Sequence, residues 1–182
     1  MSSQHTDSPQ PSSGASASAR RPSVAGPEVP EAPFPLFVSG AVSRGFGRGG
    51  KQLGIPTANL PEESVQAALR DIPVGVYLGW AQVDGLTAGP EPMVMSLGWN
   101  PYFKNERRSG EVHIMRAFSE DFYGAHMRVA VLAYIRPERD YASLDDLVRD
   151  IHVDIDVARK SLQRPAYLRV KDDAFFTDPH QA

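Results

Sequence analysis

Short runs of alternating hydrophobic and polar residues, separated by glycine and proline, fill the chain from Leu36 to Ile135, a pattern typical of β-strands. The runs that predict strands are residues 36–42, 74–83, 92–98, 111–118 and 127–135, and a further extended segment covers 55–60. Gly75 and Gly79 inside the second run favour a bend or bulge of that strand. Residues 62–69 predict a short helical turn.

The hydrophobic period changes after Pro137 to that of a helix. Ser143, with Asp146 three residues later, has the arrangement of a capping box, and Pro165 is expected to end the helix. Five aspartates on this helix are predicted to form a solvated face, in preference to a metal site: Asp145, Asp146, Asp150, Asp154 and Asp156. Strands followed by one long helix, without βαβ alternation, predict a mostly β protein. The antiparallel sheet is expected to close as a barrel, with the C-terminal helix packed outside.

Composition divides the chain into a tail and one folded domain. Residues 1–33 are rich in Ser, Pro, Ala and Gly and contain no aromatic residue, so we predict a disordered tail there and a folded domain over 34–182. The net charge of −3 argues against a nucleic-acid partner, and the absence of cysteine excludes disulfides and thiolate metal sites. No apolar run approaches the roughly 20 residues of a membrane span, and we expect a cytoplasmic protein.

A glycine-rich segment between Gly45 and Asn59 carries the first candidate chemistry. It matches the beginnings of two phosphate-binding motifs, G-x-G-x-x-G and G-x-x-x-x-G-K, but Gln52 stands where the second motif needs Ser or Thr. Pro56 opposes the helix that both motifs require. We therefore predict a loop that binds phosphate on a β scaffold, with Lys51 as its cation and with Thr57 and Asn59 as oxygen ligands of magnesium. The alternative is a glycine-rich hairpin without a ligand.

Phosphoryl transfer to a hydroxyl also needs a base, and Glu111 is the best candidate. It begins an alternating strand directly after a polar loop, although a strand-end glutamate in solvent would look the same. His113 points to the same side and is either a second base or a structural hydrogen-bonding partner. Trp99, Tyr102 and Phe103 could stack on a planar ring or anchor their loop to the barrel.

Several segments in series resemble the riboflavin kinase (flavokinase) family in its monofunctional eukaryotic form. They are RGFGRGGKQLGIPTANLP (44–61), GVYLGWA (75–81), SLGWNPYFKN (96–105), EVHIM (111–115), DFYG (121–124) and YIRPE (134–138). The resemblance runs from about residue 34 to residue 176 and departs from the commonest form at Gly50, where Ser is frequent. A loop that works through its backbone N–H groups should tolerate that change.

The resemblance implies a six-stranded antiparallel Greek-key β-barrel with a C-terminal α-helix. It implies transfer of the ATP γ-phosphate to the ribityl 5′-hydroxyl of riboflavin, giving FMN and ADP, with Mg²⁺ or alternatively Zn²⁺ as the divalent ion. By the same resemblance Thr57 and Asn59 hold the metal, while Gly45, Lys51, Thr57 and Lys104 contact the nucleotide. Glu111 inherits the role of base. Riboflavin and ATP are the expected partners of a monomer, and the rival interpretation is a flavin-binding barrel without catalysis.

Overall fold

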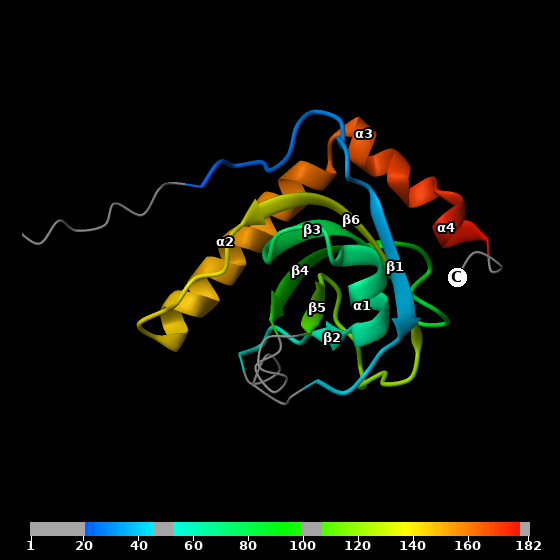
Figure 1. Cartoon of the computed structure of the whole chain (residues 1–182), viewed down its shortest axis with the longest axis horizontal. Coiled ribbons are helices and arrows are strands. Elements are labelled where there is room, and N and C mark those ends of the chain that lie inside the picture. The colour runs from blue at the N-terminus through cyan, green and yellow to red at the C-terminus, as the bar shows by residue number, and fades with distance from the viewer. Residues whose placement is uncertain (1–20, 46–52, 100–106, 179–182) are drawn as a thin grey trace, which may run out of the picture.

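The computed structural model describes residues 21–45, 53–99 and 107–178, and its centre is one antiparallel sheet of six strands. The strands are β1 (Leu36–Ala41), β2 (Ala58–Asn59), β3 (Gly75–Val83), β4 (Glu91–Trp99), β5 (Arg108–Ile114) and β6 (His126–Arg136). Their order across the sheet is β1-β6-β3-β4-β5-β2, so β6 returns beside β3 after the β3-β4-β5 meander, which is a Greek key. The sheet curls, and a bridge between Ser43 and Asn59 joins its two edges (Figure 1).

Alternation along the strands separates two hydrophobic clusters. The inner cluster fills the barrel and includes Tyr77, Met95 and Val112, each with no exposed surface. Helix α1 (Glu62–Leu69) adds Val65 and Leu69 to it. The predicted bend of β3 is confirmed by two register shifts against β6, one of them beside Gly79. A side chain at Gly79 would collide with the backbone of β6, so only glycine fits there.

The outer cluster lies between the sheet and helix α2 (Leu144–Leu162), as predicted. Ser143 caps this helix, with its Oγ accepting from the backbone N–H of Asp146 at 3.1 Å. The helix runs across the outside of the sheet, and its N-terminal end projects past it (Figure 1). Three short helical segments follow, which the sequence did not predict because four residues are too few to show a period: α3 (Pro165–Leu168), a 3-10 turn (Arg169–Asp172) and α4 (Ala174–Thr177).

The fourth predicted strand has different limits in the structure. It was expected over residues 111–118, but β5 begins at Arg108 and ends at Ile114. The chain turns after Ile114, where the N–H of Arg116 donates to the Ile114 carbonyl at 2.7 Å. Phe118 leaves the sheet and packs against Phe122 with ring centroids 4.6 Å apart, so its hydrophobicity reflects this contact and not a strand position.

Residues 21–33, which we call the N-terminal strap, make specific contacts, although composition placed them in a disordered tail. The backbone N–H of Ala25 donates to Ser161 Oγ at 2.8 Å, and Tyr167 Oη donates to the Pro27 carbonyl at 2.9 Å. Arg164 donates to the Gly26 carbonyl at 3.0 Å. Composition counts side chains, whereas these contacts use the backbone of the strap. Within the described residues, the predicted tail therefore makes ordered contacts from Arg21 onward. The predicted disorder of residues 1–20 concerns a segment outside the described residues.

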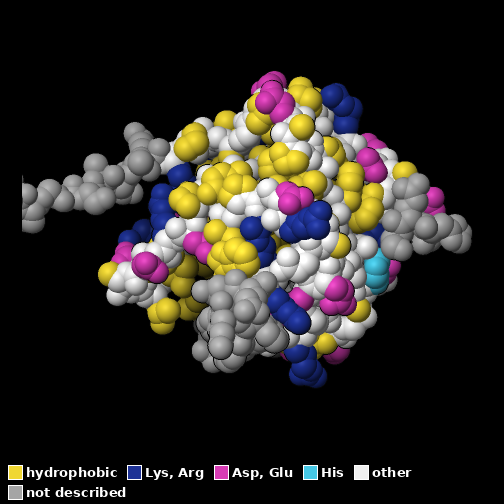
Figure 2. Space-filling model, viewed as in Figure 1, with side chains coloured by type: hydrophobic (Ala, Val, Ile, Leu, Met, Phe, Trp, Pro, Cys, Tyr) yellow, Lys and Arg dark blue, Asp and Glu magenta, His cyan; other side chains and the backbone are white. Residues whose placement is uncertain are grey.

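Basic and acidic side chains are interspersed on the face shown in Figure 2. In the described part of the chain, this face has no continuous basic surface of the kind that binds nucleic acid. None of the described helices combines the length and apolar character needed to cross a bilayer.

Candidate active site

Strand register brings two predicted site residues side by side. Asn59 of β2 is paired with Glu111 of β5, and Glu111 is paired on its other side with Ser96 of β4. Paired residues of antiparallel strands project to the same face of a sheet. Since their neighbours Ala58 and Val112 are buried inside the barrel, Asn59 and Glu111 project outward.

Gly45, at the start of the glycine-rich loop, lies against Asn59. The backbone N–H of Ser43 donates to the Asn59 carbonyl at 3.0 Å, which brings the end of the first strand segment to β2. A Cβ added at Gly45 would fall on the side-chain amide of Asn59. Glycine is needed at this position so that the loop can approach the amide closely. The fold therefore gathers Gly45, Asn59 and Glu111, which are far apart in the sequence.

His113 stabilises the backbone next to Thr57. Its Nδ1 donates to the Pro56 carbonyl at 2.9 Å, and it lies two residues beyond Glu111 on the same side of β5. Burial lowers the pKa of His113, and the hydrogen bond to Pro56 opposes this shift. A neutral imidazole that donates to a carbonyl has the geometry of a structural hydrogen-bonding partner, one of the two roles that the sequence left open.

Two pockets meet at Thr57. The first, which we call the helix-side pocket, has a volume of about 290 Å³ and is lined by Thr57, Glu111, His113 and Ile151 among others, so it lies between the sheet and α2. The second, the aromatic pocket, has a volume of about 280 Å³, and its walls include Val42, Thr57, Phe118, Phe122 and Tyr123. Glu111 lines only the first pocket, whereas Thr57 lines both.

The helix-side pocket holds a second carboxylate, that of Glu138. Burial raises the pKa of Glu138, Arg136 opposes this rise, and the nearby Glu111 adds to it. The Glu138 carboxylate lies directly over Gly98, where an added Cβ would meet Glu138 Oε1 at 2.5 Å. Of the three acidic residues that line this pocket, Asp154 is paired with Arg136. The other two, Glu111 and Glu138, lie beside a neutral histidine and are suited to accepting a proton from a bound hydroxyl.

Comparison with known proteins identifies the family of this chain. A family model described as riboflavin kinase (flavokinase) matches residues 32–162. The chain belongs to the riboflavin kinase family. It is 51% identical to the riboflavin kinase of Homo sapiens over 143 residues, which cover 79% of this chain and 91% of the human protein. The riboflavin kinase of Pyricularia oryzae is 48% identical over 163 residues, which cover 81% of this chain and 82% of that protein.

A solved structure agrees with this assignment. The crystal structure of riboflavin kinase from Trypanosoma brucei aligns with a TM-score of 0.65 and 28% identity, covering 80% of this chain and 90% of that one. The predicted family, the six-stranded antiparallel fold and the reaction class are thus confirmed. As a riboflavin kinase, the chain is an enzyme that phosphorylates riboflavin to FMN, with ATP as co-substrate and a divalent metal.

The remaining predicted site residues fall into two groups. Lys51 and Lys104 lie outside the described residues, as do Tyr102 and Phe103. Trp99 lies within the described residues. The guanidinium carbon of Arg108 lies over its ring, 4.8 Å from the ring centroid, in a cation–π contact. Trp99 thus contacts the neighbouring strand, as expected of an aromatic residue that anchors a loop.

The donor set suits a hard cation held jointly with a nucleotide. The described residues contain no group of three or more His, Asp or Glu side chains that could hold a metal by themselves. Thr57 and Asn59 offer a hydroxyl and an amide oxygen, both neutral. Mg²⁺ in nucleotide sites is typically bound by few protein ligands together with phosphate oxygens. These residues therefore fit the metal that the riboflavin kinase family implies.

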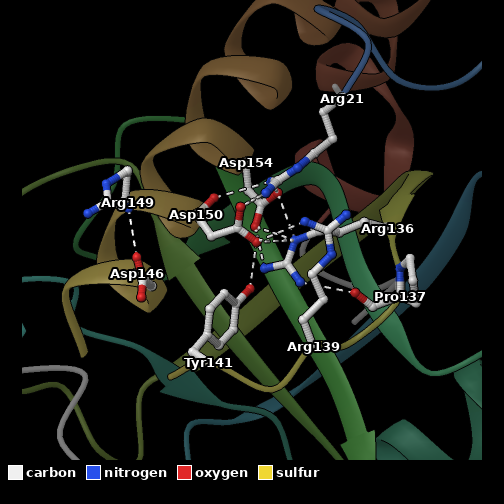
Figure 3. A network of polar contacts seen from close by, with 9 residues as sticks. All are labelled: Arg21, Arg136, Pro137, Arg139, Tyr141, Asp146, Arg149, Asp150 and Asp154. Atoms are coloured by element: carbon white, nitrogen blue, oxygen red, sulfur yellow. Dashed lines mark hydrogen bonds and ion pairs between the residues drawn. The ribbon is translucent and has the colours of Figure 1, made fainter. Parts of the chain in front are cut away.

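The prediction that all five helix aspartates form a solvated face is wrong for two of them, Asp150 and Asp154, which belong to an ion-pair network. Asp154 has 1% of its surface exposed and accepts from Arg136 Nη2 at 2.8 Å, while Asp150 accepts from Tyr141 Oη at 2.6 Å (Figure 3). Arg21 of the strap contacts both carboxylates. The sequence held a signal for Asp154: it lies three residues after Ile151, and therefore on the apolar stripe of the helix and not on its solvated side.

Proposed function

We propose that this riboflavin kinase binds ATP in the aromatic pocket and riboflavin in the helix-side pocket. We propose that the γ-phosphate passes between them beside Thr57 to the 5′-hydroxyl of the ribityl chain. The observation that carries this proposal is the position of Thr57 in both pockets, with Glu111 in only one of them. A donor and an acceptor that occupy adjoining pockets can react without leaving the protein.

On the nucleotide side, Thr57 and Asn59 would hold magnesium, and Gly45 would keep the Asn59 amide in place by leaving room for it. When bound, the magnesium ion would neutralise charge on the phosphate oxygens. Lys51 and Lys104 are expected to supply further positive charge, and aromatic rings such as Tyr123 could stack on adenine. The oxygen donors favour Mg²⁺ over Zn²⁺, which more often takes nitrogen and sulfur ligands.

On the acceptor side, Glu111 would act as the general base. Its carboxylate would take the proton of the 5′-hydroxyl as the oxygen bonds to the γ-phosphorus and the bond from phosphorus to the β,γ-bridging oxygen breaks, releasing ADP. His113 would contribute indirectly, by holding the Pro56 carbonyl and hence the backbone at Thr57. Leu147 and Ile151 of α2 line the same pocket and give it an apolar wall suited to a flavin ring.

We also propose that the enzyme is a monomer. The chain just after β1 forms the Ser43–Asn59 bridge, so the two sheet edges meet at that point, where neither is free to pair with a second copy. Light scattering of the purified protein would test this, and a dimer mass would contradict it. The expected cytoplasmic location stays a prediction, to be checked by fractionation of cells that express the full chain.

A chromatographic assay with riboflavin, ATP and magnesium tests the proposed reaction. The wild-type protein should form FMN and ADP in equal amounts. Glu111→Gln should form hardly any FMN while still binding ATP, and Glu63→Gln, an exposed glutamate on α1, is the matched control that should react normally. ATP consumed without FMN would mean another acceptor. Bound flavin without turnover would favour the non-catalytic flavin-binding barrel.

A further inference from the structure

Helix α2 buries side chains only in its second half. Each of its buried residues lies at Asp154 or later, and no residue of the helix before Asp154 is buried. The first half nevertheless supplies Leu147 and Ile151 to the helix-side pocket. One wall of that pocket therefore belongs to a stretch of helix that buries no residue fully and packs on the outer cluster only through the partly buried Ile151. The N-terminal end of this stretch projects beyond the sheet (Figure 1).

Ion pairs hold the helix at the point where this stretch meets the buried half. Arg136 of β6 donates to Asp154 from the barrel side, with Nε to Oδ2 at 3.0 Å and Nη2 to Oδ2 at 2.8 Å. Arg21 approaches the same helix from the strap and contacts the carboxylates of both Asp150 and Asp154. It also donates to the backbone carbonyl of Asp150 at 3.2 Å, so it contacts the helix backbone as well as its side chains.

This network is shielded from solvent and adjoins the pocket. The exposed fractions of the side chains are 9% for Arg21, 5% for Arg136 and 1% for Asp154. Pairs protected in this way are screened much less than surface pairs. Figure 3 shows Tyr141 and Arg139 gathered on Asp150, and both of these residues line the helix-side pocket.

Arg21 reaches the network from a backbone that is itself fixed. Ala25 and Pro27 are hydrogen-bonded to Ser161 and Tyr167, so the strap is tied to the second half of α2 and to α3. Residues 32–162 match the family model, so Arg21 lies outside that match. The contact between Arg21 and α2 is thus made by a residue outside the segment that defines the family match.

We propose that Arg21 is a positioning residue for riboflavin: it fixes the first half of α2 as the outer wall of the helix-side pocket without touching the substrate. This inference rests on the proposed function, because it assigns riboflavin to that pocket. Without Arg21, Asp150 and Asp154 keep only their partners on the barrel side. The first half of α2 then moves more freely, and riboflavin, but not ATP, binds less tightly.

Arg21→Ala, Arg21→Lys and Arg149→Ala in the full chain test the proposal. Arg149 is the matched control because it also pairs with an aspartate of α2, Asp146 at 2.7 Å, but on the exposed surface. Riboflavin affinity is measured by quenching of flavin fluorescence, KM values for riboflavin and ATP by the FMN assay, and the mobility of residues 144–153 by hydrogen exchange. Circular dichroism confirms that each variant is folded.

Arg21→Ala should weaken riboflavin binding and raise its KM about three- to tenfold, the range typical of residues that couple to a site through others. The KM for ATP should stay within about twofold, and exchange over residues 144–153 should quicken. Lysine keeps the charge without the planar fork, so Arg21→Lys should restore part of the affinity. Arg149→Ala should leave all of these quantities unchanged.

Unchanged riboflavin affinity and exchange in Arg21→Ala would overturn the proposal, as would equal increases in the KM values of both substrates. Failure of the proposed pocket assignment gives a different result, namely an Arg21→Ala variant in which exchange over residues 144–153 quickens but riboflavin affinity is unchanged. The fluorescence and exchange measurements need no turnover, so they decide the role of Arg21 even in a preparation that forms no FMN. Wild-type protein that binds no riboflavin at all would overturn both proposals together.

Discussion

The two faces of β5 show how one strand serves both stability and chemistry. Val112 and Ile114 project into the barrel with 0% and 4% of their surface exposed, whereas Glu111 and His113 project toward the helix-side pocket. The inward residues contact a closed hydrophobic cluster, and the outward ones lie opposite a helix whose first half buries no residue. The same backbone therefore presents a rigid packed surface on one side and an open reactive surface on the other.

The outward polar residues of the site are positioned by the buried row on the opposite face of the same strands. Asn59 and Glu111 occupy paired positions whose immediate neighbours, Ala58 and Val112, are also paired and are buried. Packing of the inner row fixes the register of β2 on β5, and the register fixes the distance between the two polar side chains. The two rows can therefore be perturbed separately by substitution.

The largest effect is expected from Glu111→Gln, which should reduce kcat about 10²- to 10⁴-fold because it removes the proton acceptor. The midpoint and free energy of urea unfolding should hardly change, since the side chain is exposed. Steady-state kinetics and equilibrium unfolding of the same preparation measure both quantities. A variant with wild-type turnover would remove Glu111 from the mechanism.

Val112→Ala, one residue further along β5, should lower stability while leaving turnover largely unchanged. Loss of two buried methyl groups should lower the free energy of unfolding by about 2 kcal/mol. The folded variant should keep most of its turnover, because the outward face of β5 is unchanged. A fall in turnover as steep as that of Glu111→Gln would show that the inward and outward faces of β5 do not act independently.

Thr57→Val and Asn59→Leu should each weaken magnesium–ATP binding about tenfold, the cost of one lost polar contact to a charged ligand. Riboflavin binding should change less for Asn59→Leu than for Thr57→Val, because Thr57 lines both pockets and Asn59 lines neither. Calorimetric titration with a non-hydrolysable ATP analogue and magnesium measures the affinity. Unchanged affinity in both variants would withdraw the assignment of these residues to the metal.

Gly45→Ala should have a smaller effect on the same titration, a loss of about threefold, within the range common for single substitutions. The added methyl group would displace the Asn59 amide, which lies where that methyl must go. Gly85→Ala is a useful control for the loss of a glycine, because no atom lies within 4 Å of its Cβ position, although its φ of 73° adds local strain. ATP affinity should not change in that control.

The smallest effect is expected in the dependence of folding stability on pH. The pKa of His113 is lowered by burial, so as the pH falls below about 6.5 the unfolded chain binds a proton before the folded one does. Stability from the neutral imidazole is therefore present above pH 6.5 and decreases as the pH falls toward the folded pKa. His113→Gln, which can still donate to the Pro56 carbonyl, should flatten this decrease in urea midpoints. The exposed His152→Gln should preserve most of the decrease, because burial lowers the pKa of His113 more than the nearby His152 does. An undiminished slope in His113→Gln would contradict the prediction.

Much of the site could be predicted from local pattern. Alternation over residues 111–114 placed Glu111 and His113 on one face and Val112 and Ile114 on the other, as the structure has them. Ser143 and the spacing of the leucines predicted helix α2 to within a few residues. Both signals are local, since the period of side-chain direction and the satisfaction of helix-end donors involve residues only a few positions apart.

Predictions from composition and from helical periodicity were wrong where a residue contacts a partner far away in the sequence. Residues 21–33 contain little to bury, yet their backbone carbonyls are acceptors for Arg164 and Tyr167. Asp154 is charged, yet it is buried because Arg136 and Arg21 surround it. A buried charge needs a partner of opposite charge, and the residues next to Asp154 in the sequence do not show which residue that partner is.

Local sequence patterns indicated which strand residues point inward or outward and where the long helix begins. They also supplied the candidate residues for phosphoryl transfer, whose roles stay predictions. Packing between distant segments decided that Asn59 lies beside Glu111 and Gly45, that Thr57 lines two pockets, and that Arg21 contacts α2. The two kinds of information differ in the sequence separation over which they act. Side-chain direction repeats every two or 3.6 residues, whereas register and ion pairing between distant segments depend on the packing of the whole barrel.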